Sequence, residues 1–365
     1  MAQVTSRSVM KVRICGLVSC ILLSNYTLVA SASSARAEVP VQSTQLSNRA
    51  VFTDVAAAGN RLVAVGERGI VLISDDGAKS WRQVSIPVTS GLTAVRFLDA
   101  KEGWAIGHAG VVLHTTDGGD NWQLQLDGTQ AAQIELASAK QSVDVANAQN
   151  LEEAQHRLET AQRLVDDGPD KPFLAMEFSD HQNGLVVGAF GLAMRTRDGG
   201  KTWSSAMGDI ENPNGMHLYA VTHSGDQWYL GGEQGYFARS DNAGSSFTSH
   251  ETPYAGTYFA LASLPGGKVF IAGLKGNAFV STDSGETFAA LTNHVPATIN
   301  RSLILGDGRV LMASQAGQVF ITDSNKSLEP YGASLYAPLS GLAQTVDGKI
   351  VTAGFSGLKS LPKIQ

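Results

Sequence analysis

Short apolar or alternating segments recur along most of the chain, and each is followed by a tight turn. The runs "LTAVRFL" (92–98) and "GWAIG" (103–107) form one pair, and "YFALASL" (258–264) and "KVFIAG" (268–273) form another. Alternation with a period of two is typical of half-buried strands. The connecting sequences, such as "PGGK", carry the small and polar residues that hairpin turns need. The pattern therefore predicts antiparallel hairpins.

The paired strands belong to a repeat of about 41 residues. Each copy continues from a Gly-x-x-Gly sequence through a third strand into a turn such as "HTTDGGDNW" (114–122), and then into a fourth strand. The copies start at Gly66, Gly107, Gly188, Gly232, Gly273, Ser314 and Gly354, which places successive starts 41, 81, 44, 41, 41 and 40 residues apart. Sheets with two apolar faces must stack, and radial stacking buries both faces. The sequence therefore predicts an all-β fold, a seven-bladed β-propeller of four-stranded antiparallel blades.

The two ends of the repeat region are incomplete in complementary ways. The last copy stops after three strands, and the segment "VPVQSTQL" (39–46) precedes the first complete copy. A propeller removes open sheet edges by closing its ring. We therefore expect the propeller to span residues 38–365, with the N-terminal segment supplying the outer strand of the last blade.

The double-length interval contains an insertion at residues 126–170. Residues 130–167 have no glycine or proline and are rich in strong helix formers. An apolar stripe runs along its second half through Leu151, Ala154, Leu158, Ala161 and Val165, but the first half does not continue it in phase. We expect a two-helix hairpin that breaks near residues 147–150. Its stripe, with Leu151 and Leu158, is a candidate for binding a partner; packing on the propeller rim is the alternative.

The turn between the third and fourth strands resembles the Asp-box, also called the BNR repeat. Its aspartate can accept hydrogen bonds from amides of its own turn, its glycine permits an unusual backbone conformation, and its aromatic residue is expected to pack between blades. Repetition around a ring favours a structural role over a catalytic one. The residues concerned are Asp76, Trp81, Asp117, Gly119, Trp122, Asp198, Gly200, Trp203, Asp283, Gly285 and Phe288.

The Gly-x-x-Gly loops are the candidate working surface. The insertion joins the fourth strand of one blade to the first strand of the next, and in a propeller these connections share a face with the loops between second and third strands. The Asp-box turns lie at the opposite end. The mixed chemistry of the loops suits a protein or another extended ligand: Arg68, His108, Phe190, Glu233, Gln234, Lys275, Gln315 and Phe355.

The first 37 residues have the pattern of an export signal. Three basic residues precede an apolar run of about 17 residues, and "ARA" (35–37) offers a cleavage site. An uncleaved anchor is the alternative, although the run is short for a bilayer span. "LVSC" (17–20) also resembles, weakly, a lipoprotein box. We expect a signal peptide at residues 1–37 and a periplasmic protein.

Removal of this segment changes the charge and the cysteine content. It takes away four basic residues and no acidic ones, so the formal charge changes from −6 to −10. Such an acidic protein lacks the basic surface that binds phosphates, which argues against DNA or any other nucleic acid as a partner. Both cysteines, Cys15 and Cys20, also leave, which excludes disulfides from the mature chain.

The repeats together resemble the photosystem II stability/assembly factor family. The stretches "GWAIGHAGVVLHTTDGGDNW" and "GLVVGAFGLAMRTRDGGKTW" carry the resemblance most clearly. It implies a seven-bladed propeller that acts as an exported, non-enzymatic scaffold for a membrane or exported protein complex. The family also occurs in bacteria without a photosystem, so the resemblance leaves the complex open.

A glycan-binding or sialidase-like propeller is the alternative function. A sialidase needs an arginine cluster, a tyrosine nucleophile and separate acid groups, whereas Arg195, Arg197 and Arg239 stand beside repeat turns. The eight histidines show no metal-ligand spacing. We expect no catalytic residue, no metal and no cofactor, and a monomer that binds another protein.

Overall fold

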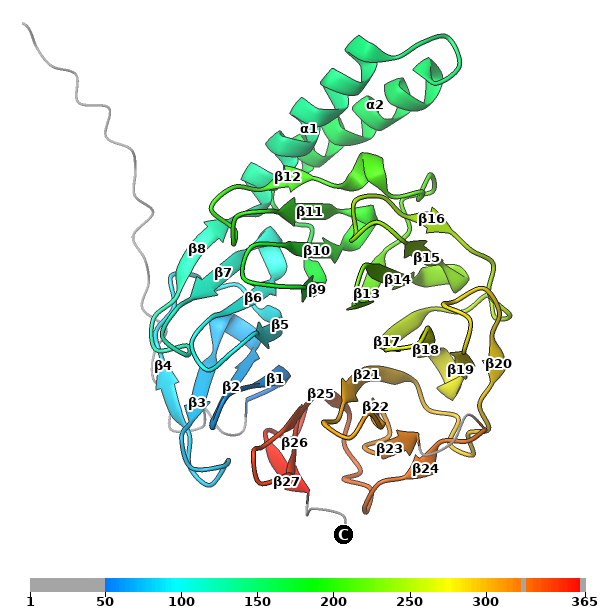
Figure 1. Ribbon diagram of the computed structural model, residues 1–365. Helices are drawn as coiled ribbons and strands as arrows, with labels where there is room; N and C mark the ends of the chain where they lie inside the picture. The colour runs from blue at the N-terminus through cyan, green and yellow to red at the C-terminus, as the bar shows by residue number, and fades with distance from the viewer. Residues whose placement is uncertain (1–49, 323–325, 362–365) are drawn as a thin grey trace, which may run out of the picture. The chain divides into compact units, whose positions relative to one another are not determined.

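The computed structural model describes residues 50–322 and 326–361, which form seven antiparallel sheets around a central channel (Figure 1). Each sheet contains strands that are consecutive in sequence, so each is one blade. Blade 1 consists of β1 (Phe52–Ala58), β2 (Arg61–Gly66), β3 (Val71–Ser74) and β4 (Arg82–Val84). Blade 2 consists of β5 (Leu92–Phe97), β6 (Gly103–Gly107), β7 (Val112–Thr115) and β8 (Gln123–Leu126). Blade 3 consists of β9 (Phe173–Phe178), β10 (Gly184–Gly188), β11 (Ala193–Thr196) and β12 (Ser204–Ser205).

The remaining blades follow the same order. Blade 4 consists of β13 (Leu218–Ser224), β14 (Gln227–Gly232), β15 (Phe237–Ser240) and β16 (Thr248–Ser249), and blade 5 of β17 (Tyr258–Leu264), β18 (Lys268–Gly273), β19 (Ala278–Ser281) and β20 (Ala289–Ala290). Blade 6 consists of β21 (Ile299–Ile304), β22 (Val310–Ser314), β23 (Val319–Thr322) and β24 (Glu329–Pro330). The described strands of blade 7 are β25 (Leu339–Gln344), β26 (Ile350–Gly354) and β27 (Lys359–Leu361). The predicted fold class is confirmed.

The ring closes between blade 7 and blade 1. The inner strand β1 packs against β5 on one side and against β25 on the other. Six of the described blades have four strands and blade 7 has three. The strand expected from residues 39–46 and the signal peptide expected at residues 1–37 lie outside the described residues.

Apolar side chains fill the space between neighbouring blades. The fully buried indole of Trp104 in blade 2 stacks on Phe178 of blade 3, with ring centroids 3.9 Å apart. Equivalent clusters join blades 1 and 2 and blades 3 and 4. Burying apolar surface stabilises by about 25 cal/mol per Å², so each blade depends on its neighbours for stability.

Each of the seven described inner strands has a β-bulge at its second residue. In β1, for example, Phe52 pairs with Gly66 and Asp54 pairs with Val65, which leaves Thr53 between them without a partner residue in the ladder. The same shift occurs in the other six inner strands. A bulge turns one side chain away from the regular alternation between the two faces of a sheet. The side chains of these seven residues can therefore point in a direction that the alternation does not predict.

The insertion is the predicted two-helix hairpin. Helix α1 (Gly128–Val145) begins at Asp127, which forms a capping box with Gln130, and helix α2 (Leu151–Asp167) follows after a break at residues 146–150. The hairpin projects from the connection between blades 2 and 3 (Figure 1). Neither of these two helices in the described chain is long and apolar enough to cross a membrane.

Candidate functional site

The Asp-box turns are closed loops of hydrogen bonds. In the copy of blade 5, Oδ1 of Asp283 accepts from the backbone N–H of Thr287 at 2.9 Å, and Oγ of Ser281 accepts from the N–H of Gly285 at 2.8 Å. Gly285 has φ of 86°, a left-handed conformation that a side chain would oppose. The hydrogen bonds from Thr287 lower the pKa of Asp283 to about 2. The carboxylate is therefore used within its own turn.

The departures from the repeat keep this geometry. Ala78 occupies the glycine position of blade 1 with φ of 67°, and its N–H still donates to Oγ of Ser74. Asn242 replaces the aspartate of blade 4, and its Oδ1 accepts from the N–H of Ser246 at 3.0 Å. The turn therefore needs an acceptor atom at this position rather than a negative charge.

The aromatic residues of the turns pack between blades, as predicted. Trp122 is buried in the cluster of blades 1 and 2, and its indole N–H donates to the carbonyl of Gly119. The equivalent rings contact the clusters formed by neighbouring blades, and these are Trp81, Trp203, Phe247 and Phe288.

Arginines beside the turns connect three blades to the blade that follows each of them. The guanidinium of Arg195 in β11 donates to the carbonyl of Gly244 in the turn of blade 4, and Arg239 in β15 donates to the carbonyl of Ser284 in the turn of blade 5. Arg61 in β2 contacts the turn of blade 2 in the same way through Gly118. These arginines belong to third or second strands and hold blades together, so they do not form a substrate-binding cluster.

The Gly-x-x-Gly loops lie at the opposite end of the third strands, on the face where the hairpin starts. Of the eight residues proposed for this face, Glu233 is half-buried, and its carboxylate accepts from the backbone N–H of His217. The other seven are exposed: Arg68, His108, Phe190, Gln234, Lys275, Gln315 and Phe355.

The loops of blades 1 to 5 hold a non-glycine residue in the left-handed conformation. Arg68, Ala109, Phe190, Gln234 and Lys275 occupy the same loop position with φ between 55° and 59°. This conformation is rare for residues other than glycine, and its repetition makes it part of the geometry of these loops. The fold thus presents one side chain per loop on this face, which we call the loop face.

Four of the nine large exposed apolar residues in the described part of the chain lie on the loop face. Phe190, Leu274 and Phe355 lie in Gly-x-x-Gly loops, and Tyr336 lies in the connection from blade 6 to blade 7. Phe190 is 50% exposed and Tyr336 is 91% exposed. Val145 and Leu151 add two further exposed side chains at the tip of the hairpin. Exposed apolar residues on one face make that face a candidate interaction surface.

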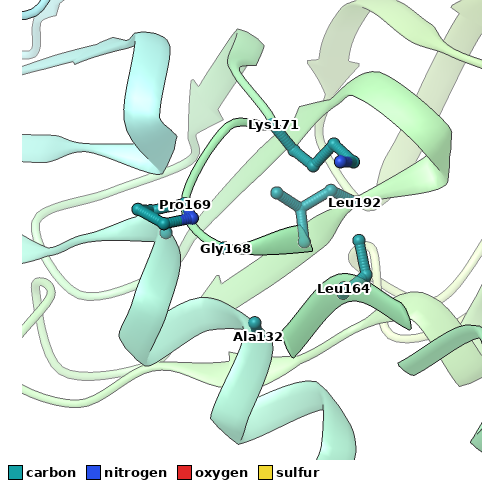
Figure 2. A pocket seen from close by; sticks show the side chains of 7 residues that line it. Ala132, Leu164, Gly168, Pro169, Lys171 and Leu192 are labelled. Atoms are coloured by element: carbon teal, nitrogen blue, oxygen red, sulfur yellow. The ribbon is translucent and has the colours of Figure 1, made fainter. Parts of the chain in front are cut away.

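The hairpin packs closely on blade 3 at its base. Figure 2 shows Ala132 of α1 and Leu164 of α2 facing Leu192, which follows the loop of blade 3, with Lys171 beside them. The crevice between them has a volume of only about 10 Å³, too little for any ligand larger than water. Lys171 continues towards the loop face, where its Nζ lies 5.2 Å from the centroid of the Phe190 ring.

A buried ion pair links the two helices to each other and to blade 3. Glu135 of α1 is 1% exposed and accepts two hydrogen bonds of 2.9 Å from Arg157 of α2, while Oγ of Ser205 in β12 donates to the same carboxylate. Leu158 packs against a small apolar cluster between the helices. The predicted stripe is therefore divided: Leu158 serves the helix–helix contact, whereas Leu151 remains exposed.

The central channel has a volume of about 510 Å³ and is lined by the inner strands of all seven described blades. Its wall combines apolar side chains with polar and charged ones, and the charged side chains meet at two places. Arg301 of β21 pairs with Asp54 of β1. Arg96 of β5 pairs with Glu177 of β9, which also contacts Nδ1 of His223 in β13 at 2.9 Å. Both carboxylates are buried and occupied by these contacts.

A family model described as "Photosynthesis system II assembly factor YCF48" matches residues 33–142 and 155–328. The chain belongs to this family. The matched segments cover blades 1 to 5 and the first three strands of blade 6, and they leave out residues 143–154, which include the tip of the hairpin.

One curated relative from the photosystem II assembly factor family has low sequence identity to this chain. The "Photosystem II assembly lipoprotein Ycf48" of Synechococcus sp. (strain CC9902) is 22% identical over 151 residues, which are 41% of this chain and 45% of that protein. The chain thus matches less than half the length of this relative.

Two solved family structures have a similar fold. One, described as "YCF48 bound to D1 peptide", has a TM-score of 0.62 and 14% identity and covers 90% of this chain and 97% of that chain. YCF48 from Cyanidioschyzon merolae has a TM-score of 0.58 and 16% identity, with coverage of 88% and 97%. These similarities establish the propeller fold.

The sequence predicted on which side of the propeller the Gly-x-x-Gly loops lie, but not the charged groups of the channel. Comparison of the repeats could have indicated two of these charged residues. The third residue of four inner strands is alanine, whereas blades 1 and 6 have Asp54 and Arg301 at this position. Spacing also could not reveal that His114 and His181 both contact the carboxylate of Glu102, at 3.0 and 2.6 Å. No group of three metal-binding side chains occurs in residues 50–322 and 326–361.

Proposed function

We propose that this protein is an exported, non-catalytic accessory factor that binds a segment of a membrane or exported protein at its loop face. The observation that carries the proposal is that Phe190, Leu274, Tyr336 and Phe355 remain exposed in loops of the same face. A structural role alone would not require apolar side chains to remain exposed.

Family membership supports a role in assembly. One relative of the same fold is described as bound to a D1 peptide, and another as a photosystem II assembly lipoprotein. By analogy we propose a peptide segment of a membrane complex as the partner, without specifying a photosystem. The basic, apolar N-terminal sequence supports export to the periplasm, where the protein would act as a monomer.

The channel supports a non-catalytic function over the sialidase-like alternative. A glycosidase needs a free carboxylic acid and a second carboxyl group placed on either side of one bond. Asp54 and Glu177 are instead paired with Arg301 and Arg96, and Glu177 also contacts His223. Glycan binding without cleavage is the competing function, and a glycan array distinguishes it from protein binding.

Site-specific photocrosslinking in cells tests the proposal. A photoreactive residue replaces Arg68, Phe190 or Lys275 on the loop face, and matched controls carry it at Thr116 or Thr282 in exposed Asp-box turns. We expect one membrane or exported protein to be crosslinked from the loop face and not from the turns. Equal crosslinking from both faces, or no protein adduct together with retention on a glycan array, would contradict the proposal.

A further inference from the structure

The seven blades provide an internal comparison at the bulged second residue of each inner strand. In four blades this residue donates a hydrogen bond to the backbone of the next blade. Thr53, Thr93, Asn300 and Ser340 donate to the carbonyls of Leu92, Phe173, Leu339 and Phe52, at 2.6 to 2.7 Å. The repeated contact shows that the ordinary role of the bulge is to fasten one blade to the next.

Blades 3, 4 and 5 have a different residue type at this position and do not make this hydrogen bond. Their equivalent residues are Leu174, Tyr219 and Phe259, which lack a short polar group that could donate in this way. Tyr219 and Phe259 line the mouth of the channel and are half-buried, so their rings are neither in a core nor fully in water. Half-buried aromatic side chains at an opening are common in ligand-binding surfaces.

These rings continue outwards as a connected strip. The ring of Tyr219 lies 4.8 Å from Phe259, and its hydroxyl lies 3.3 Å from Nδ1 of His217. The ring of His217 lies 4.7 Å from Phe190, over which the Nζ of Lys171 lies. Phe190, His217, Tyr219 and Phe259 form what we call the aromatic strip. It leads from the base of the hairpin to the mouth of the channel.

The outer end of the strip is held in a strained conformation. Phe190 has φ of 56°, and it is the one aromatic residue among the five left-handed loop positions. Glycine would adopt this conformation without strain. Because Phe190 is 50% exposed, burial in a core does not account for its presence at this position.

The arrangement of the rings favours a peptide over a sugar chain. Phe190 and His217 meet at 66°, and Tyr219 and Phe259 meet at 67°. Rings set edge to face form apolar notches rather than one flat platform on which sugar rings could stack. Grooves lined by aromatic residues bind extended segments that contain proline, because such segments lose little entropy on binding.

The border of the strip is acidic. The carboxylates of Asp167 and Asp170 flank Lys171 at one end, and Glu233 is held beside His217 by its hydrogen bond to the backbone. Three carboxylates against one ammonium group leave a net negative charge, which complements basic residues in the ligand.

We infer that the aromatic strip binds an extended segment of another protein that contains proline or aromatic residues and has lysine or arginine beside them. The inference rests on the proposed function and specifies the partner chemistry and the part of the loop face that contacts it. Blades 3 to 5 and the hairpin base would bind this segment, and blades 1, 6 and 7 would not.

Selection from a phage library of random 12-residue peptides tests the inference with the full chain. We expect the enriched peptides to contain proline or aromatic residues flanked by lysine or arginine. Fluorescence polarisation with the best peptide should show that Phe190→Ala and Phe259→Ala each weaken binding about tenfold or more. Tyr219→Phe keeps the ring and should bind like the wild type, and an unchanged thermal midpoint would show that each variant is folded.

Phe355→Ala is the matched control, because Phe355 is an exposed aromatic residue of the loop face outside the strip. It should leave the affinity within about twofold. Peptides that depend on Phe355 but not on Phe190 or Phe259 would overturn the inference and leave the proposed loop face intact. If no peptide is enriched and oligosaccharides bind through Phe190 and Phe259, the inference is wrong. If photocrosslinking from the loop face also yields no protein adduct, the proposed function is rejected as well.

Discussion

The guanidinium of Arg301 in blade 6 pairs with the carboxylate of Asp54 in blade 1, across the inner strand of blade 7. The two residues are separated by 247 positions in sequence. Asp54 is 2% exposed and also accepts hydrogen bonds from the backbone N–H groups of Val55 and Val95. The pair therefore connects three blades on both sides of the point where the ring closes.

Removing this cation should destabilise the propeller. Arg301→Met keeps most of the side-chain length but leaves the buried carboxylate of Asp54 without its counter-charge, which costs about 3 to 5 kcal/mol. Urea unfolding measures the loss, and the double variant Asp54→Asn, Arg301→Met should recover part of it. The control Arg309→Ala disrupts an exposed pair with Asp307 and should cost less than about 1 kcal/mol. Equal losses for Arg301 and Arg309 would contradict a role in ring closure.

Gly341 makes room for this pair in blade 7. A Cβ atom at this position would lie 2.7 Å from the Cα of Asp54 and 2.9 Å from the nitrogen of Val55. Backbone atoms cannot move aside cheaply, so Gly341→Ala should destabilise by about 2 kcal/mol or more. The matched control is Gly306→Ala, because no atom lies within 4 Å of a Cβ built there. A thermal midpoint that falls equally for both variants would show that the close approach in blade 7 is unimportant.

The Asp-box turns should make stability depend on acid. The pKa of Asp283 falls from 3.8 to about 2 on folding, so the folded protein binds this proton less tightly than the unfolded chain does. The contribution is complete above pH 4 and is lost as the pH falls through about 2. Asp283→Asn should keep the turn, as Asn242 does, and cost less than about 1 kcal/mol at pH 7.

Urea unfolding of the wild type and of Asp283→Asn between pH 2 and pH 7 gives the comparison. The difference in free energy of unfolding should shrink as the pH falls, because asparagine does not titrate. A difference that stays constant over this range would mean that hydrogen bonds from Thr287 do not favour the charged carboxylate.

The ion pair between Glu135 and Arg157 should keep the two-helix hairpin rigid. Arg157→Ala leaves the carboxylate of Glu135, which is 1% exposed, without a cation. We expect amide hydrogen exchange to increase at residues 128–167 by about tenfold or more and to stay unchanged in the inner strands, because opening would be local. Arg163→Ala, on an exposed part of α2, should leave exchange as in the wild type. Faster exchange throughout the propeller would show that the hairpin and the blades unfold together.

The sequence by itself determined the features that depend on local order. The 41-residue period located the blades, the helix formers and the break near Asn147 predicted the hairpin, and the connectivity placed the Gly-x-x-Gly loops opposite the Asp-box turns. Such inferences succeed because turn chemistry and strand alternation act over a few residues and are repeated, so each copy supports the others.

Only the tertiary structure decided which unique residues meet. Arg96, Glu177 and His223 belong to blades 2, 3 and 4, and Phe190 reaches Phe259 through side chains of blade 4. No periodicity encodes these contacts, because ring closure brings together strands that are tens to hundreds of residues apart. The helices show the same limit: the stripe on α2 was visible in sequence, but only packing against α1 determined that Leu158 is covered and Leu151 is exposed.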